Sequence, residues 1–256
     1  DLLLGKVKEK ENFISSDDFY LQHNITFVKD CKVSLVNTQK NLVYGKNTEA
    51  IPYDFLIISS GRRFVAPQIT GAKKTGVFCL NSLSDFQDFR AYASGESVCV
   101  VGANRWAREV AARLALTRKE IRLIHTDPIN CAGSPEPPLV GIEVIQDELV
   151  EIIGESQVQA VKLKGGKIIG TSAVLYMEEA KSNIDFLKNS QIGLCDDLIS
   201  VNEHLRTNRE NVFACGAVCK SSEQENTLET WDEVVCQSQF LAQHLLSVLQ
   251  SLVESR

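Results

Sequence analysis

The sequence predicts an α/β fold, and the stretch from Ser97 to His125 gives the clearest reason. It contains an apolar run, a tight turn that begins at Gly102, a helix-like stretch and a second apolar run. A strand, a glycine turn, a helix and a second strand in this order form half of a dinucleotide-binding unit. In such a unit the turn aims the free N–H groups of the helix start at a pyrophosphate.

The glycine turn departs from the usual pattern, G-x-G-x-x-G/A, at one position. The chain has Gly102, Asn104 and Ala107 there, so the first glycine is kept, the third is a permitted alanine and the second is lost. The second glycine lets the backbone approach the phosphates without a Cβ in the way, and Asn104 restores that Cβ. We therefore expect a dinucleotide-binding turn that is present and weakened.

Composition and charge exclude several classes of protein. A chain of 256 residues with 44% hydrophobic content can bury a core as one large domain or two smaller ones. The net charge is -6 and the basic residues are scattered, so nucleic acid is not an expected partner. No apolar run approaches the roughly 20 residues that cross a bilayer, so no membrane span is expected.

The cysteines indicate a reducing compartment. Eight of them occur without a repeated spacing: Cys31, Cys79, Cys99, Cys131, Cys195, Cys215, Cys219 and Cys236. They are interpreted as reduced thiols, which predicts a cytoplasmic protein. An organelle matrix is the alternative, because the chain opens at Asp1 and a removed leader peptide stays open. The C-x-x-x-C pair at Cys215 and Cys219 is interpreted as two small residues beside a glycine turn.

No metal site and no catalytic side chain are expected. The histidines share no metal-ligand spacing, and none accompanies a serine or cysteine motif typical of a triad: His23, His125, His204 and His244. Cys31 and Cys79 stand alone in strand-like surroundings, where a cysteine is usually a small buried hydrophobe.

The first part of the chain is expected to be rich in β-structure. Short strands are predicted at Ile25–Val28, Val33–Val36 and Leu42–Tyr44, followed by a longer apolar strand at Tyr53–Ser59. A helix is predicted to begin after the Ser and Asp residues of 81–85, because these residue types cap helix starts.

The second part alternates loops, strands and one long helix. Four prolines between Pro128 and Pro138 predict an exposed loop. A small antiparallel set is predicted from Ile142–Ile153, Gln157–Leu163 and Lys167–Ile169, followed by strands at Ala173–Met177 and, as the last strand, Val212–Cys215. The segment 228–252 predicts an amphipathic helix that packs its apolar stripe, Trp231 and Leu249 included, within its own domain.

Four stretches, in this order, resemble the pyridine nucleotide-disulfide oxidoreductase family, especially its nitrite-reductase-like, rubredoxin-reductase-like and NADH-oxidase-like branch. Tyr53–Gly61 resembles Y-D-x-L-(I/V)-(I/V)-A-T-G, and Val100–Glu109 resembles the NAD turn V-G-G-G-x-x-G-x-E. Val174–Leu187 is similar to V-V-V-A-I-G-x-R-P-N-x-x-L, with Asn183 and Leu187 kept. The stretch 205–218 is similar to L-R-T followed by N-(I/V)-(Y/F)-A-A-G-D-V.

The resemblance implies a flavoprotein with two dinucleotide-binding domains. A Rossmann-like NAD(P)-type domain, residues 86–203, would be inserted into an incomplete FAD-type domain made of residues 1–85 and 204–256. The family's first flavin motif, G-x-G-x-x-G, is not found before Ser97, so the chain is expected to be truncated relative to the family and to lack the first βαβ unit of that domain. Ser60, Gly61, Gly216 and Ala217 would then lie near FAD, and Gly102, Asn104, Arg105 and Ala107 around the pyrophosphate of NAD or NADP.

Three departures from the family pattern weaken the cofactor sites. In the family an aspartate at this position accepts hydrogen bonds from the ribityl hydroxyls of the flavin, and Ala217 has no side-chain acceptor to replace it. Each lost hydrogen bond of this kind would weaken flavin binding by about 1.5–3 kcal/mol. His125 stands where an acidic residue would hold the adenine ribose. Asp127 beside it offers an acceptor, whereas His125 with Arg122 would favour a 2′-phosphate, so NAD and NADP both stay open. Glu179 replaces a glycine and adds negative charge near a pyrophosphate.

The leading hypothesis is an NAD(P)H-dependent flavoprotein oxidoreductase that passes a hydride from nicotinamide to flavin and electrons to an unknown acceptor. The alternative is a catalytically inert family member that acts as a structural or binding subunit. A third reading has a separate polypeptide supplying the first flavin-binding unit. Because a missing strand leaves an open sheet edge, a protein partner or self-association is also expected.

Overall fold

The computed structural model describes residues 15–93, 97–117, 120–126, 139–221 and 230–254. The chain forms two compact units: Phe64–Ala180, together with the described residues before Tyr20, makes up the first, and Tyr20–Arg63 with Lys181–Arg256 makes up the second. The short helix α1 (Asp17–Gln22) contains the point in the chain, between Phe19 and Tyr20, where the first unit gives way to the second. Strands β5 (Arg62–Phe64) and β14 (Ala180–Ser182) lie where the chain passes between the units.

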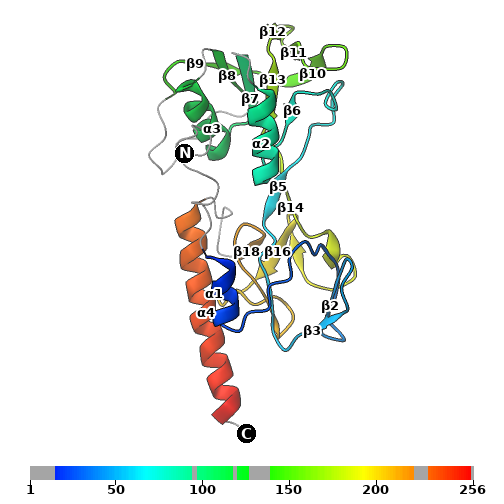
Figure 1. Ribbon diagram of the computed structural model, residues 1–256, viewed down its shortest axis with the longest axis vertical. Coiled ribbons are helices and arrows are strands. Elements are labelled where there is room, and N and C mark those ends of the chain that lie inside the picture. The colour runs from blue at the N-terminus through cyan, green and yellow to red at the C-terminus, as the bar shows by residue number, and fades with distance from the viewer. Residues whose placement is uncertain (1–14, 94–96, 118–119, 127–138, 222–229, 255–256) are drawn as a thin grey trace. The chain divides into compact units, whose positions relative to one another are not determined.

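The first unit is built on a parallel sheet with the strand order β6-β13-β7-β8-β9 (Figure 1). Its strands are β6 (Val77–Phe78), β7 (Ser97–Val101), β8 (Glu120–His125), β9 (Ile142–Gln146) and β13 (Ala173–Tyr176). The order places the first strand of the sequence-predicted unit, β7, in the middle of the sheet. The elements that flank the glycine turn therefore form as expected.

Both faces of this sheet are covered, as a parallel sheet requires. Val98 and Val100 pack with Phe89 of α2 (Leu83–Tyr92) and with Leu114 of α3 (Arg105–Ala115). The alternate residues of β7 pack on a small antiparallel sheet made of β10 (Leu149–Ile153), β11 (Ala160–Leu163) and β12 (Ile168–Gly170). Because β7 is buried on both faces, the turn that follows it has a rigid base.

The second unit combines several short sheets around one core. Strands β1 (Val33–Asn37), β2 (Leu42–Gly45) and β3 (Ile51–Pro52) are antiparallel, whereas β4 (Leu56–Ile58) and β17 (Val212–Ala214) form a parallel pair. Strands β15 (Leu194–Cys195), β16 (Leu198–Val201) and β18 (Cys219–Ser221) form a third sheet, and the 3-10 helix η2 (Asp185–Leu187) packs beside β1. The long helix α4 (Trp231–Glu254) adds Leu241 to this core.

Three element predictions are wrong. Ile25–Val28 joins no strand among the described residues, since its apolar side chains are largely exposed and no sheet covers them. Strand β9 joins the parallel sheet instead of the antiparallel set, because Ile142 packs on one face of that sheet and Ile145 on the other. The last strand is β18, which follows β17 and pairs with β16. The predicted proline loop, residues 128–138, and Cys131 lie outside the described residues.

The unit boundaries differ from the expected 1–85, 86–203 and 204–256. Residues 64–85 belong with the parallel sheet, since β6 pairs with β13. Residues 181–203 belong with the other unit, because Ile184, Leu187 and Ile199 lie in its core. The assignment of one cofactor to each unit stays a prediction.

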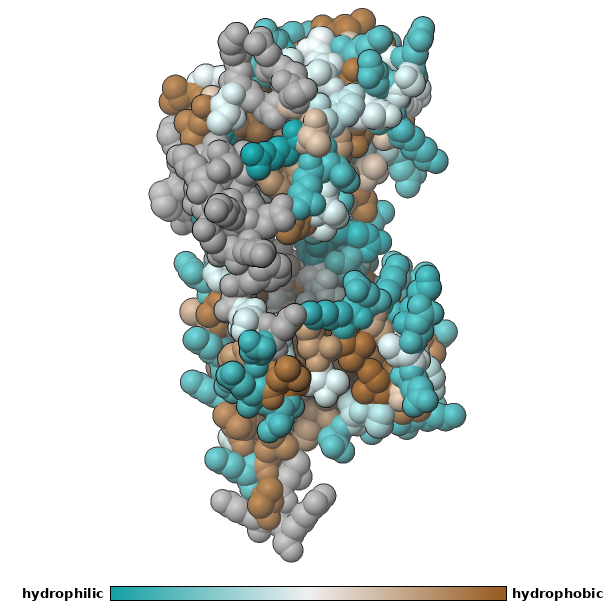
Figure 2. Space-filling model, in the orientation of Figure 1, coloured by the Kyte–Doolittle hydropathy of each residue, from teal (hydrophilic) through white to brown (hydrophobic). Residues whose placement is uncertain are grey.

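Helix α4 packs its apolar stripe only in part within its own unit. Leu241 is 2% exposed and Leu245 packs against the core, whereas Trp231 and Leu249 are exposed. Figure 2 shows apolar residues along the C-terminal half of this helix, where Leu246 and Val253 are also exposed. No helix of the described residues has both the length and the apolar character that crossing a membrane requires.

Two of the leucines of α4, Leu241 and Leu246, provide a matched test of this packing. We expect Leu241→Ala to lower the free energy of unfolding by about 2–5 kcal/mol, because it leaves a cavity in the core. Leu246→Ala, at a position 60% exposed, should change it by less than about 0.5 kcal/mol. Urea denaturation followed by tryptophan fluorescence measures both values. Equal losses for the two variants would contradict the observed orientation of the helix.

Candidate functional site

The first candidate site is the glycine turn at the carboxyl end of β7. Gly102 has a φ of +144°, and a Cβ built there would lie 2.7 Å from the carbonyl oxygen of Met177. Its N–H donates to the carbonyl of Ile124 at 2.8 Å. The turn is thus wedged between β13 and β8 and tolerates only glycine at this position.

Asn104 is the N-cap of α3 and ties the turn to β13. Its Oδ1 accepts a hydrogen bond from the Ala107 N–H at 2.9 Å, and its Nδ2 donates to the carbonyl of Met177. Ala107 is fully buried against the sheet, which explains why a small residue stands there. The side chain that replaces the second glycine therefore uses one of the N–H groups that a helix start offers to a phosphate.

Acidic and aromatic side chains stand beside this turn, at the carboxyl edge of the sheet. The carboxylate of Glu178 accepts hydrogen bonds from Thr126 Oγ1 at 2.9 Å and from the Tyr176 hydroxyl at 3.2 Å. Burial, followed by the negative charge of Glu178, raises the pKa of Tyr176 well above its usual value. His125, at the end of β8, is 4% exposed. The buried imidazole of His125 thus stands at the end of β8, where an acidic residue was expected, and the carboxylate of Glu178 comes from the end of β13.

The second candidate site is formed by two turns that follow β4 and β17. These strands pair in parallel register, so their carboxyl ends lie at the same edge. Ser60 and Gly61 follow β4, and both of their carbonyls accept hydrogen bonds from Asn183. Gly216, with a φ of +80°, follows β17 and donates its N–H to Oε1 of Gln237 in α4 at 2.6 Å.

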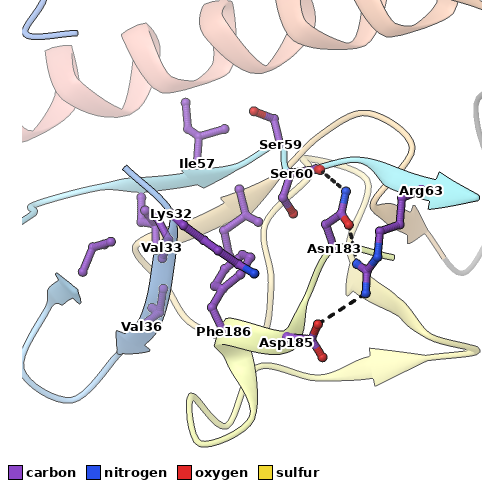
Figure 3. Close-up of a pocket in the computed structure, with 13 residues that line it drawn as sticks. Lys32, Val33, Val36, Ile57, Ser59, Ser60, Arg63, Asn183, Asp185 and Phe186 are labelled. Carbon is purple, nitrogen blue, oxygen red and sulfur yellow. Dashed lines mark hydrogen bonds and ion pairs between the residues drawn. The ribbon is translucent and has the colours of Figure 1, made fainter. Parts of the chain in front are cut away.

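A pocket of about 570 Å³ opens beside the first of these turns (Figure 3). Its apolar wall comes from β1, β2, β4 and η2, and its polar lining consists of Lys32, Ser59, Ser60, Arg63, Asn183 and Asp185. Arg63 donates to Asn183 Oδ1 at 2.5 Å and lies 3.5 Å from a carboxylate oxygen of Asp185. The buried Oγ of Ser60 has no hydrogen-bond partner, which marks a polar position that a ligand would satisfy.

The predicted residues fall into these two sites. Gly102, Asn104, Arg105 and Ala107 form the turn of the first unit, and Ser60, Gly61, Gly216 and Ala217 follow the paired strands of the second. Sequence reasoning missed Lys32, Arg63, Asp185 and Glu178. Arg63 lies two residues after the glycine of one matched motif, and Glu178 and Asp185 lie within the matched stretch Val174–Leu187. No pattern marked Lys32.

The cysteines of the described residues do not form a redox centre. All seven of them are free, and burial raises the pKa of Cys99 to about 11 and that of Cys219 to about 12. Cys215 is also buried, and its pKa is raised for the same reason. Thiols in this state are poor nucleophiles at neutral pH. Among the described residues, no group of three or more metal-ligating side chains comes together.

A family model described as pyridine nucleotide-disulphide oxidoreductase matches residues 3–237, and the chain belongs to this family. The NADH oxidase of Methanocaldococcus jannaschii is 24% identical over 232 residues, which cover 83% of this chain and 52% of the relative. The NADH-rubredoxin oxidoreductase of Clostridium acetobutylicum is 24% identical over 210 residues, covering 81% and 54%. The chain spans about half the length of these curated relatives.

Solved structures show the same fold. The reductase–putidaredoxin complex gives a TM-score of 0.83 at 19% identity, with 94% of this chain and 63% of that chain covered. A ferredoxin reductase from Rhodopseudomonas palustris gives 0.85 at 17% identity, with 96% and 65% covered. The fold is therefore that of the FAD- and NAD(P)-binding pyridine nucleotide-disulfide oxidoreductases.

The family implies FAD and a nicotinamide dinucleotide, and the described residues are compatible with both groups. For the dinucleotide, the Gly102 turn and the start of α3 have the required geometry, although Asn104 uses one donor. For the flavin, the unpaired Oγ of Ser60 in the pocket wall is a suitable polar contact. Ala217 offers no acceptor, and Gln237 already binds the N–H of Gly216.

Alkylation tests the assignment of the cysteines. At pH 8 we expect iodoacetamide to modify the exposed Cys195 and Cys236 and to spare Cys99 and Cys219, since raised pKa values leave few thiolates below about pH 10. Mass spectrometry of tryptic peptides measures the order of modification. Rapid labelling of Cys219 in the folded protein would show that the region around β18 opens or that its thiol is activated.

Proposed function

We propose that this protein is an NAD(P)H-dependent flavoprotein oxidoreductase, with the dinucleotide at the Gly102 turn of the first unit and FAD in the second. The observation that carries the proposal is the 570 Å³ pocket whose wall contains the buried, unpaired Oγ of Ser60. This pocket lies beside the turn that ends the first motif of the second unit. Membership of the family supports an oxidoreductase in general terms.

The chain's own residues would bind and orient the two groups. Arg63 is fixed by Asn183 and Asp185, so its guanidinium is held at the rim of the pocket at little further entropic cost. The apolar side chains of Val36 and Ile58 would exclude water from one side of a planar ring. Flavin, when bound, supplies the hydride-accepting chemistry, and no protein acid or base is required for that transfer.

An inert family member is the second candidate, and specific contacts favour it. Ala217 and the Gln237–Gly216 hydrogen bond remove flavin contacts, and Asn104 removes a phosphate contact. Each lost hydrogen bond to a charged group weakens binding by about 1.5–3 kcal/mol, or one to two decades in affinity. Such a protein would use the same fold as a structural or binding subunit.

Spectroscopy separates the two candidates. We expect the purified protein, incubated with FAD and freed of excess cofactor, to retain flavin absorbance that bleaches when NADH or NADPH is added under anaerobic conditions. A colourless protein whose melting temperature does not rise with FAD or with either dinucleotide would overturn the proposal in favour of the inert subunit. Retained colour without bleaching would restrict the activity to flavin binding.

Restoring the missing flavin acceptor is a test by gain of affinity. We expect Ala217→Asp to tighten FAD binding about 10- to 100-fold, because a carboxylate regains hydrogen bonds from ribityl hydroxyls. Ala242→Asp, an exposed position on α4, serves as the control for added charge. Fluorescence quenching of FAD measures both dissociation constants. Equal effects of the two substitutions would place the flavin away from Ala217.

The cap of α3 permits a second test. Asn104→Gly frees the Ala107 N–H at little expense to the helix, since glycine is a fair N-cap. We expect NADH to bind about tenfold tighter to this variant. Asn104→Asp, which keeps the cap and adds a negative charge, should weaken binding. Isothermal titration calorimetry of the parent protein and the two variants measures the dissociation constant for NADH. An unchanged affinity in both variants would show that the dinucleotide does not bind at this turn.

A further inference from the structure

The carboxylate of Glu178 reaches across the carboxyl end of β7 in the first unit. Strands β13 and β8 lie on either side of β7 in the parallel sheet. Tyr176 is in register with Val101, and Val101 with Ile124, so Glu178 and Thr126 each stand two residues beyond the same row. Their side chains meet at 2.9 Å even though their strands are two positions apart in the sheet.

The register fixes where this contact runs. Adjacent strands are about 4.8 Å apart, so β13 and β8 are separated by about 9.6 Å. The Glu178–Thr126 hydrogen bond must therefore pass over the carboxyl end of β7, where Gly102 begins its turn. In open α/β sheets this is the crevice through which the ligand's phosphates reach the helix start.

The carboxylate is held firmly in that place. The Tyr176 hydroxyl binds its second oxygen at 3.2 Å, and Tyr176 itself is buried. Asn104 holds the carbonyl of Met177, the residue immediately before Glu178. Two hydrogen bonds and an anchored backbone thus hold the negative charge of Glu178 beside the Gly102 turn. We name this contact of Glu178 with Thr126 and Tyr176 the carboxylate clasp.

We propose that the carboxylate clasp sets the dinucleotide affinity of this protein, so that a nicotinamide dinucleotide binds only by displacing Glu178 from Thr126. The inference rests on the proposed function of the first unit. Its physical basis is like-charge repulsion, because two phosphates would enter beside a carboxylate that two hydrogen bonds hold in place. The clasp makes Glu178 a specificity-determining residue at the position where the family pattern has an apolar side chain.

Two variants separate the effect of the Glu178 charge from the effect of its hydrogen bond with Thr126. Glu178→Gln keeps the shape and the contact with Thr126 but removes the charge, and we expect it to bind NADH about tenfold tighter than the parent protein. Thr126→Val keeps the charge but releases the carboxylate toward solvent, and we expect a smaller gain, about threefold. Glu155→Gln, on an exposed loop of the same unit, is the control and should leave the dissociation constant unchanged.

A double-variant cycle tests the clasp without any ligand. Melting temperatures are measured for Glu178→Ala, which removes the contact with Thr126, for Thr126→Val and for the double variant. A joint loss smaller than the sum of the two single losses is expected for side chains in contact. Strictly additive losses would show that the two side chains do not meet, and the inference would fall whatever the binding data show.

The outcomes of the binding experiment are distinct. Tighter NADH binding in both variants, with the control unchanged, supports the clasp. Binding in the parent protein that neither variant alters overturns the clasp and leaves the proposed function standing. If neither the parent nor the opened variants bind NADH or NADPH at millimolar concentration, dinucleotide binding at this crevice is refuted, and the clasp falls with it.

Discussion

The close contact between the Gly102 turn and the end of β13 governs the first unit. The absent Cβ of Gly102 leaves room for the carbonyl of Met177, and Asn104 binds that same carbonyl from the other side of the turn. Because the strand before Gly102 is buried on both faces, the turn cannot move away to relieve a larger side chain. The start of α3 is consequently held at the carboxyl edge of the sheet, where the fold positions its ligands.

The two candidate sites differ from the family pattern in different ways. In the first unit the glycine turn and the helix start are present, and the side chains of Asn104 and Glu178 would use or face the position proposed for the phosphates. In the second unit the apolar pocket and a polar contact at Ser60 remain, but an acceptor is gone at Ala217. Added groups can be displaced by a ligand, whereas a missing acceptor cannot be replaced without substitution.

Helix α4 links the core of the second unit to the turn at Gly216. Gln237 of α4 satisfies the N–H of Gly216, and the same helix contributes Leu241 to the core. The helix therefore couples core packing to the turn at Gly216. The hydrogen bond from Gln237 stabilises this turn, and it uses a backbone N–H at the place where we propose that the flavin binds.

The sequence alone was sufficient for the glycine turn, the helix after Ser82, the strands around them and the family, because these depend on local periodicity, capping residues and the order of short motifs. It failed for Ile25–Val28, an apolar run with nothing to cover it, and for β9, whose choice between a parallel and an antiparallel partner depends on strands distant in the chain. The lining of the pocket by Lys32, Arg63 and Asp185, and the meeting of Glu178 with Thr126, were decided only by the tertiary structure. Contacts between residues tens of positions apart follow from sheet order and register, which no local pattern encodes.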